Sequence, residues 1–188
     1  ALVTDILKGA GVAIDNTIPP GSEGYLDKKP AKLDLAGASA LLTKAGWKKG
    51  SDGIWQKTDK KKKVVRLAFN LATAATPELR GTAEELVTQW EKLGAEVTVS
   101  VYDLSDLDQN LIRPRKFDAL LFGEVLGRDP DLYSFWHSSQ RQAPGLNIAQ
   151  YVSATADKIL ESARREDDPE VRASLDEKFQ IELAKDTP

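Results

Sequence analysis

The chain has 188 residues, with 26 Lys or Arg against 29 Asp or Glu, and so a net charge of −3. This balance leaves no basic surplus for a phosphate backbone, which argues against nucleic acid as a partner, and the sequence has no apolar run of the roughly 20 residues that a membrane span needs. The absence of cysteine and the single histidine, His137, exclude disulfides, zinc–thiolate sites and metal sites built on several imidazoles.

The first third of the chain predicts a loop followed by a capped helix. Prolines and glycines within residues 14–30 are incompatible with a helix or a central strand. Asp34 then stands at a typical N-cap position, and apolar residues follow it at helical spacing. Gly46 is suited to end this helix in the left-handed conformation, with Trp47 placed to pack back on the last turn.

Two short strands joined by a charged turn come next. Residues 53–55 and 64–69 have strand character, and the turn between them holds Asp59 and the run Lys60–Lys63. We interpret the lysine run as the solvated tip of a hairpin, because a run of like charges is usually a hydrated surface.

The middle of the chain carries the clearest fold signal. Thr76 and Pro77 predict a helix start and Gly94 its end. Residues 96–102 alternate as a strand does, and residues 117–122 form an apolar run of the kind that is buried on both faces of a sheet. A short helix is expected between these two strands, from Ser105, with three leucines turned inward: Leu104, Leu107 and Leu111. The order predicts an α/β fold with a mostly parallel βαβαβ sheet flanked by helices.

The end of the chain combines a long irregular segment with two helices. Residues 124–152 show little periodicity but are rich in aromatic residues, Gly and Pro, which favours an ordered binding loop. Ligands of open α/β sheets gather at the carboxyl ends of the strands, where this loop begins. Ser153 and Asp168 are the expected caps of the two closing helices, the second with Val171 turned inward.

Catalytic interpretations of this loop find little support. His137 adjoins Ser138 and Ser139, but residues so close in sequence rarely meet with nucleophile–base geometry, and no GxSxG elbow is present. Asp129 and Asp131 form a carboxylate pair that is more typical of turn chemistry. We therefore expect no catalytic residue and no metal site.

A series of short motifs carries a family resemblance over nearly the whole chain. In chain order they are Leu41-Leu42, Ala45-Gly46-Trp47, Asp52–Trp55, Trp90–Gly94, Phe117–Gly123, Asp129-Pro130-Asp131, Trp136–Ser139, Gly145–Asn147, Tyr151 and Asp157–Leu160. Each motif alone is weak, but the ordered series resembles the family 5 extracellular solute-binding proteins, which are the dipeptide, oligopeptide and nickel receptors of ABC importers.

The resemblance implies a lobe of the type II periplasmic-binding-protein kind. Residues 1–188 would form a single α/β lobe, truncated at both ends, and the first lobe of the receptor would be absent. The lack of methionine, even at position 1, also suggests an excised piece, with any secretion signal upstream of it. The two lobes would close on a solute without catalysis and without a cofactor. The expected partners are the solute, a membrane ABC permease and the missing lobe, at an extracytoplasmic location in the periplasm or on a lipoprotein anchor.

The resemblance also implies where the solute binds. In peptide-binding members an acidic residue four positions before the proline of the Asp-Pro motif pairs with the free amino group of the peptide; here that position holds Leu126. Glu124 is the nearest substitute, because residues 124 and 126 share one side of an extended segment. The predicted ligand-binding residues are Gly123, Glu124, Val125, Leu126, Gly127, Arg128, Trp136 and Asn147.

Peptide is the favoured solute, but other possibilities remain open at this point. The ligand can instead be one without a free amino terminus, such as a nickel chelate, a sugar or another small molecule. A self-contained α/β enzyme domain is the remaining alternative, and it would gather Asp129, Asp131, His137 and Ser138 in one deep pocket.

Overall fold

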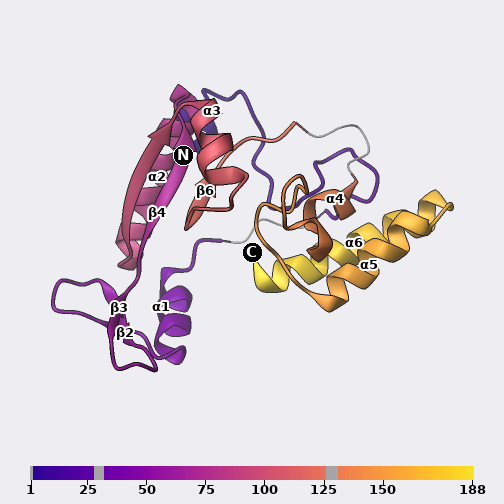
Figure 1. Ribbon diagram of the computed structural model, residues 1–188. Helices are drawn as coiled ribbons and strands as arrows, with labels where there is room; N and C mark the ends of the chain where they lie inside the picture. Colours follow the sequence, from indigo (N-terminus) through magenta and orange to yellow (C-terminus); the bar gives the residue numbers. More distant parts are fainter. Residues whose placement is uncertain (1, 28–31, 126–130) are drawn as a thin grey trace. The chain divides into compact units, whose positions relative to one another are not determined.

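A computed structural model of the protein describes residues 2–27, 32–125 and 131–188 (Figure 1). The chain divides into two compact units. Unit 1 contains residues 1–12, 32–111 and 116–123, and unit 2 contains residues 13–31, 112–115 and 124–188. The expected single lobe over residues 1–188 stays a prediction.

Unit 1 is built on the predicted parallel sheet. Its strands are β4 (Ala68–Ala74), β5 (Glu96–Tyr102) and β6 (Ala119–Leu121), in the order β5-β4-β6, and both pairings are parallel. Leu71 lies opposite Val99 on one side and Ala119 on the other. Because α2 (Pro77–Leu93) joins β4 to β5, while α3 (Leu104–Leu107) and the π-helical turn η2 (Asp108–Ile112) come between β5 and β6, the βαβαβ order is confirmed.

Helix α2 has the predicted ends and covers the sheet. The Thr76 side chain accepts a hydrogen bond from Leu79 N, Pro77 is the first helical residue, and Gly94 closes the helix with φ +102°. Apolar residues of α2 pack on β4 and β5, and the rings of Phe69 and Trp90 meet edge to face at 5.1 Å. The amphipathic pattern of the sequence thus becomes one continuous core.

A second, antiparallel sheet in unit 1 was predicted only in part. It consists of β1 (Lys48–Lys49), which the sequence did not reveal, β2 (Trp55–Thr58) and β3 (Val64–Arg66). The expected strand 64–69 divides at Leu67, whose N–H donates to Trp55 O while its own carbonyl accepts from Glu96 N. Leu67 is therefore the residue at which the backbone changes from the small sheet to the large one.

The helix that precedes this sheet, α1 (Leu35–Lys44), has the predicted Asp34 cap, which accepts from Gly37 N at 2.7 Å. Gly46, with φ +86°, follows its last turn as predicted. A single π-helical turn, η1 (Leu2–Ile6), lies near the start of the described chain.

Unit 2 is mainly helical. Short helix α4 (Leu132–Trp136) and the 3₁₀ turn η3 (Ser138–Gln140) lie within the long loop, and α5 (Ala154–Arg165) and α6 (Pro169–Asp186) run side by side in Figure 1. Ser153 and Asp168 cap these two helices as predicted. The core that holds the unit together consists of Ile18, Leu132, Tyr151, Ala156, Leu160, Phe179 and Leu183.

Three predictions of burial are wrong. Leu104 is 62% exposed and Val171 is 45% exposed, although both were expected to turn inward. Strand β6 is shorter than residues 117–122 and is half-buried, since within the described residues it pairs with β4 alone. An apolar run reports a preference for burial, but the position of a strand in the sheet decides how much of it is covered.

None of the helices in the described part of the chain combines the length and the apolar character that a bilayer crossing requires.

Candidate functional site

The carboxyl ends of the three parallel strands lie at one edge of the large sheet. Ala75 N donates to Tyr102 O at 2.9 Å, which holds the end of β4 against the end of β5. The buried Thr73 hydroxyl donates to Leu121 O at 2.9 Å and does the same for β6. This edge is where open α/β sheets collect ligands, and the chain leaves it at residues 122–125.

The three predicted ligand residues that the structure describes in this segment are accessible. A Cβ atom built on Gly123 meets no atom within 4 Å, so the backbone there is open to approach. Glu124 is exposed, and the Val125 side chain is 100% exposed. The other three predicted ligand residues of the segment, Leu126, Gly127 and Arg128, lie outside the described residues. The structure therefore does not test the effect of Leu126 standing where peptide-binding members carry an acidic residue. Contact between a solute and this segment stays a prediction.

Glu124 is the titratable group of this segment. Although the residue is exposed to solvent, nearby protein atoms partly desolvate its carboxyl and raise the pKa above the ordinary value of 4.5. Because desolvation penalises the charged form, a cation placed beside Glu124 would stabilise the carboxylate and lower that pKa again. Binding of an ammonium group by Glu124 stays a prediction.

Trp136 and Asn147, the other two predicted ligand residues, belong to the packing of unit 2. The Trp136 ring lies 6.3 Å from that of Tyr151 and 6.2 Å from that of Phe179. It also lines a cavity of about 240 Å³ together with Thr17 and Gln180. These contacts account for Trp136 as a packing residue.

Asn147 is completely buried, and both ends of its amide are occupied. Its Nδ2 donates to the carbonyls of Trp136, His137 and Tyr151 at 3.0–3.2 Å, and its Oδ1 accepts from Tyr151 N at 3.0 Å. With every donor and acceptor used inside the loop, the geometry favours a positioning role. Solute contact by Asn147 stays a prediction that none of these bonds supports.

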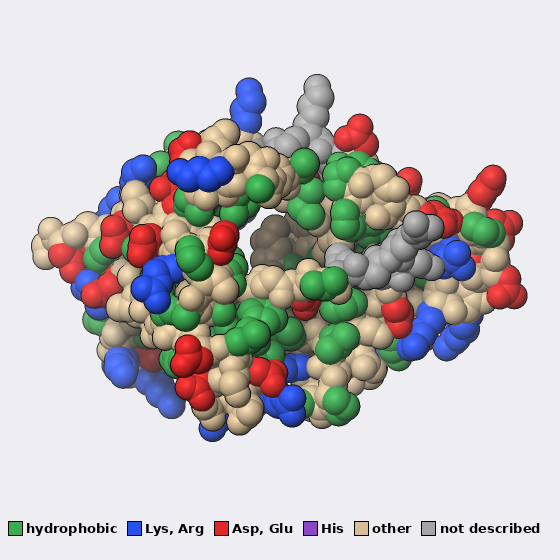
Figure 2. All heavy atoms as spheres, turned by 90° about the horizontal axis from the view of Figure 1, so that it is seen from above, with side chains coloured by type: hydrophobic (Ala, Val, Ile, Leu, Met, Phe, Trp, Pro, Cys, Tyr) green, Lys and Arg blue, Asp and Glu red, His purple; other side chains and the backbone are tan. Residues whose placement is uncertain are grey.

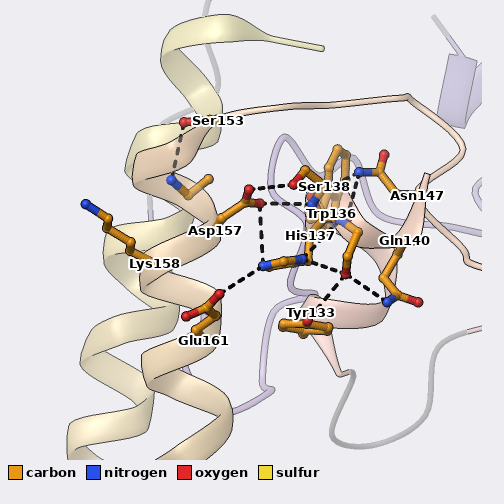
Figure 3. Close-up of polar contacts among 12 residues, drawn as sticks. Tyr133, Trp136, His137, Ser138, Gln140, Asn147, Ser153, Asp157, Lys158 and Glu161 are labelled. Carbon is orange, nitrogen blue, oxygen red and sulfur yellow. Dashed lines mark hydrogen bonds and ion pairs between the residues drawn. The ribbon is translucent and has the colours of Figure 1, made fainter.

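His137 lies at the centre of a polar cluster between α4 and α5 (Figure 3). Its Nδ1 accepts from Ser139 N at 3.1 Å and lies 2.8 Å from Ser139 Oγ. Its Nε2 faces Glu161 Oε1 at 3.5 Å and Asp157 Oδ1 at 3.9 Å, and its ring stacks on Tyr133 at 4.1 Å. His137 thus meets Ser139 within hydrogen-bond distance, and the question is whether this contact has the nucleophile–base geometry that the sequence analysis considered rare.

The contacts of this cluster are those of a capped turn. The backbone N–H of Ser139 donates to the Nδ1 lone pair, so the ring proton belongs on Nε2, beside the carboxylates. A lone pair held by a backbone N–H is poorly placed to take a proton from a nucleophile. His137 and Ser139 line neither of the two cavities described in unit 2. The geometry thus favours His137 as the N-cap of η3.

Asp131 is tied into local structure as turn chemistry requires. Its Oδ2 accepts from Ser134 Oγ at 2.7 Å and lies 3.4 Å from Arg164 Nη2. Asp129 is outside the described residues. Among those described, no group of three or more His, Asp or Glu side chains is arranged to hold a metal ion.

The sequence analysis missed Arg115 altogether, and it named Asp157 only as part of a family motif, without its role in positioning the long loop. Arg115 donates to the carbonyls of Ile112, Arg141 and Gly145, at 2.5, 3.1 and 2.6 Å. Asp157 accepts from Ser138 N at 2.9 Å and from Ser138 Oγ at 2.6 Å. The sequence does not reveal these contacts, because most of the partners lie 19 to 30 residues away and are mostly backbone atoms.

Similarity to known proteins extends over the whole chain. The family profile described as bacterial extracellular solute-binding proteins, family 5 Middle, matches residues 1–147. The sequence is 30% identical to the oligopeptide-binding protein AppA of Bacillus subtilis over 194 residues, which covers 100% of this chain and 35% of AppA. It is 32% identical to Protein XP55 of Streptomyces lividans over 190 residues, covering 99% of this chain and 33% of XP55.

Solved structures show the same likeness. The structure of AppA from Bacillus subtilis in complex with a nonapeptide superposes with a TM-score of 0.87 at 30% identity, over 100% of this chain and 37% of that one. NikZ from Campylobacter jejuni in complex with Ni(L-His) gives a TM-score of 0.83 at 25% identity, over 97% of this chain and 36% of NikZ. The chain thus spans about a third of the length of these relatives.

Proposed function

The chain belongs to the bacterial extracellular solute-binding proteins of family 5, and on that premise we propose that it is part of the substrate-binding component of an ABC importer that takes up peptides. Members of this family bind substrates. The protein would capture its peptide by closure of two lobes and release it to a membrane permease, making and breaking no covalent bond. Its place of action would be outside the cytoplasm.

One observation carries the choice of peptide: the likeness to nonapeptide-bound AppA extends over 100% of the chain, with a TM-score of 0.87. The accessible segment fits such a ligand. Beyond β6, Gly123 offers open backbone and Val125 an exposed apolar side chain. An extended peptide presents repeated N–H and C=O groups, so it binds such a segment through main-chain hydrogen bonds whatever its side chains are.

The proposal assigns a specific role to Glu124. In the proposed complex its carboxylate pairs with the amino terminus of the peptide, in place of the acidic residue that the family carries where Leu126 stands. Ion pairs that close away from water depend on both partners, because a charge left alone pays a large desolvation cost.

The test is calorimetric titration of the complete receptor with a peptide and with its N-acetylated form. We expect acetylation to weaken binding at least tenfold in the wild type and much less in Glu124→Gln. Glu177→Gln, which neutralises an exposed residue of α6, is the matched control and should behave as the wild type. If neither peptide form binds, the peptide proposal fails; if both bind equally, the role of Glu124 fails.

A nickel chelate is the second candidate, favoured by the likeness to NikZ with its bound Ni(L-His). The same titration with Ni²⁺–histidine separates the two, since a peptide receptor should show no saturable heat with this probe.

A further inference from the structure

The basic residues of this acidic chain are concentrated in one short segment. Between Lys44 and Arg66 lie nine of the 26 basic residues but only two of the 29 acidic ones, Asp52 and Asp59. This segment therefore carries a net charge of +7, and the rest of the chain −10. On the face shown in Figure 2, by contrast, acidic and basic side chains are interspersed.

The tip of the β2–β3 hairpin holds the densest part of this charge. Asp59 Oδ1 accepts from the backbone N–H groups of Lys61 and Lys63, both at 2.8 Å, and Lys62 has a left-handed φ of +62°. The aspartate shapes the turn, and its single charge offsets only one of the four lysines. All four residues of Lys60–Lys63 are exposed, and no ion pair to them occurs among the described residues.

Apolar side chains lie directly beside these charges. Val64 is 56% exposed and Val65 is 41% exposed, on a strand that pairs with β2 and has no partner on its other side in the described sheet. The one arginine of the segment, Arg66, is already paired with Asp52 at 2.7 Å and Glu96 at 2.9 Å. What remains is a hydrated lysine cluster with a small apolar rim.

This combination indicates the kind of surface that fits it. Lysine is a mobile point charge, which suits diffuse attraction to many phosphates better than the two-pronged recognition that arginine provides. Exposed aromatic rings, on which nucleic-acid bases stack, are missing from the hairpin: Trp55 is 5% exposed. Lysines that reach phosphate headgroups while their stems and neighbouring apolar side chains enter the interface are typical of membrane-surface binding.

We propose that the β2–β3 hairpin, with Lys60–Lys63 at its tip and Val64 and Val65 beside them, docks the protein on a membrane surface rich in anionic phospholipid. The inference goes beyond the proposed function, since it concerns where the protein is held and not which solute it binds.

The experiment is co-sedimentation of the 188-residue chain with vesicles of phosphatidylcholine alone or with about one third phosphatidylglycerol. We expect binding to the anionic vesicles only, and its loss on raising the salt from about 0.05 M to 0.5 M, because salt screens surface charge. Each lysine near such a surface contributes about fivefold in affinity. Replacing all four residues of Lys60–Lys63 by Gln should therefore weaken binding at least thirtyfold.

The matched control replaces four other exposed lysines by Gln: Lys92, Lys116, Lys158 and Lys178. It changes the net charge equally and should keep most of the binding. If the two variants lose vesicle binding equally, the attraction is to the overall charge of the protein and the proposal is overturned. Equal binding of the wild type to vesicles with and without phosphatidylglycerol would also overturn it. Circular dichroism checks that both variants fold. Retention of the wild type on poly-aspartate without binding to anionic vesicles would assign the hairpin to an acidic protein instead.

Discussion

At the scale of single residues, the amide of Asn147 joins three parts of a segment that has little regular structure. Its bonds to the carbonyls of Trp136, His137 and Tyr151 tie the end of α4, the residue that follows it, and the segment two residues before the α5 cap to one point. Buried polar groups stabilise a fold when all are satisfied and destabilise it when one partner is removed. The described part of this loop, residues 131–152, therefore depends on a side chain that is itself inaccessible.

We predict that Asn147→Ala lowers the free energy of unfolding by at least about 2 kcal/mol, because it leaves buried backbone groups without partners. Urea denaturation followed by tryptophan fluorescence measures the change. Gln142→Ala, an exposed position in the same loop, is the control and should cost less than about 0.5 kcal/mol. Equal costs for the two variants would contradict the positioning role.

Tyr151 adds a pH dependence at the same scale. Burial, and then the hydrogen bond from its hydroxyl to Asp186 at 2.8 Å, raise the pKa of Tyr151 above 10. Because the pKa is raised in the folded state, the neutral phenol of Tyr151 contributes to the free energy of unfolding. This contribution is complete below the unfolded pKa of about 10, and it is lost as the pH rises through the folded pKa.

Tyr151→Phe should therefore be less stable than the wild type by about 1 kcal/mol at pH 8, and the difference should shrink in the alkaline range above pH ~10. Urea denaturation at pH 8 and near pH 11 measures both values. A difference that stays constant across this range would count against the phenol as its source.

At the scale of elements, the end of α2 is also a contact with the small sheet. Trp55 Nε1 donates to Leu93 O at 2.7 Å, and Trp55 N donates to Gly94 O at 3.0 Å. Two carbonyls at the C-terminal end of α2, which have no partner inside the helix, are thus satisfied by the first residue of β2. A Cβ atom on Gly94 would lie 2.7 Å from Gly53 O and 3.1 Å from Trp55 Cδ1.

The two glycines at this contact form a matched pair for measurement. Gly94 has φ +102° and Gly53 has φ +83°, but a Cβ on Gly53 meets nothing within 4 Å. Gly53→Ala should cost about 1 kcal/mol from backbone strain alone. Gly94→Ala should cost more than about 2 kcal/mol, since it adds a clash with backbone. Thermal unfolding that ranks the two variants equally would disprove the close approach.

At the scale of the whole molecule, the chain covers about a third of the length of its relatives. In the proposed two-lobed receptor, the solute is held by contacts from both lobes, and closure is stabilised by the ligand that touches both. The piece that contains Gly123–Val125 would supply only a share of those contacts.

We therefore predict that the 188-residue chain by itself binds a peptide at least 100-fold more weakly than the complete receptor does, as measured by calorimetry with the same peptide on both. The complete receptor is its own positive control. Comparable affinities would mean that one lobe holds the whole site, and the picture of two-lobe capture would then be wrong.

The sequence by itself determined the elements whose signals lie within a few residues. Three helices, α2, α5 and α6, begin where their capping residues Thr76, Ser153 and Asp168 predicted. Strand β5 has the bounds that the alternation of residues 96–102 predicted. These predictions succeed because capping bonds and side-chain periods are local. The order of these elements then led to the parallel sheet, and the ordered motifs to the family.

Tertiary structure alone decided the features that depend on distant partners. Leu67 divides one apolar run between two sheets because its two backbone bonds go to Trp55 and Glu96. Asn147 is buried because the loop folds around it, and β6 is half-covered because of its place at the edge of the sheet. A residue's partners across tens of positions are fixed by how the chain packs, and neither composition nor period carries that information.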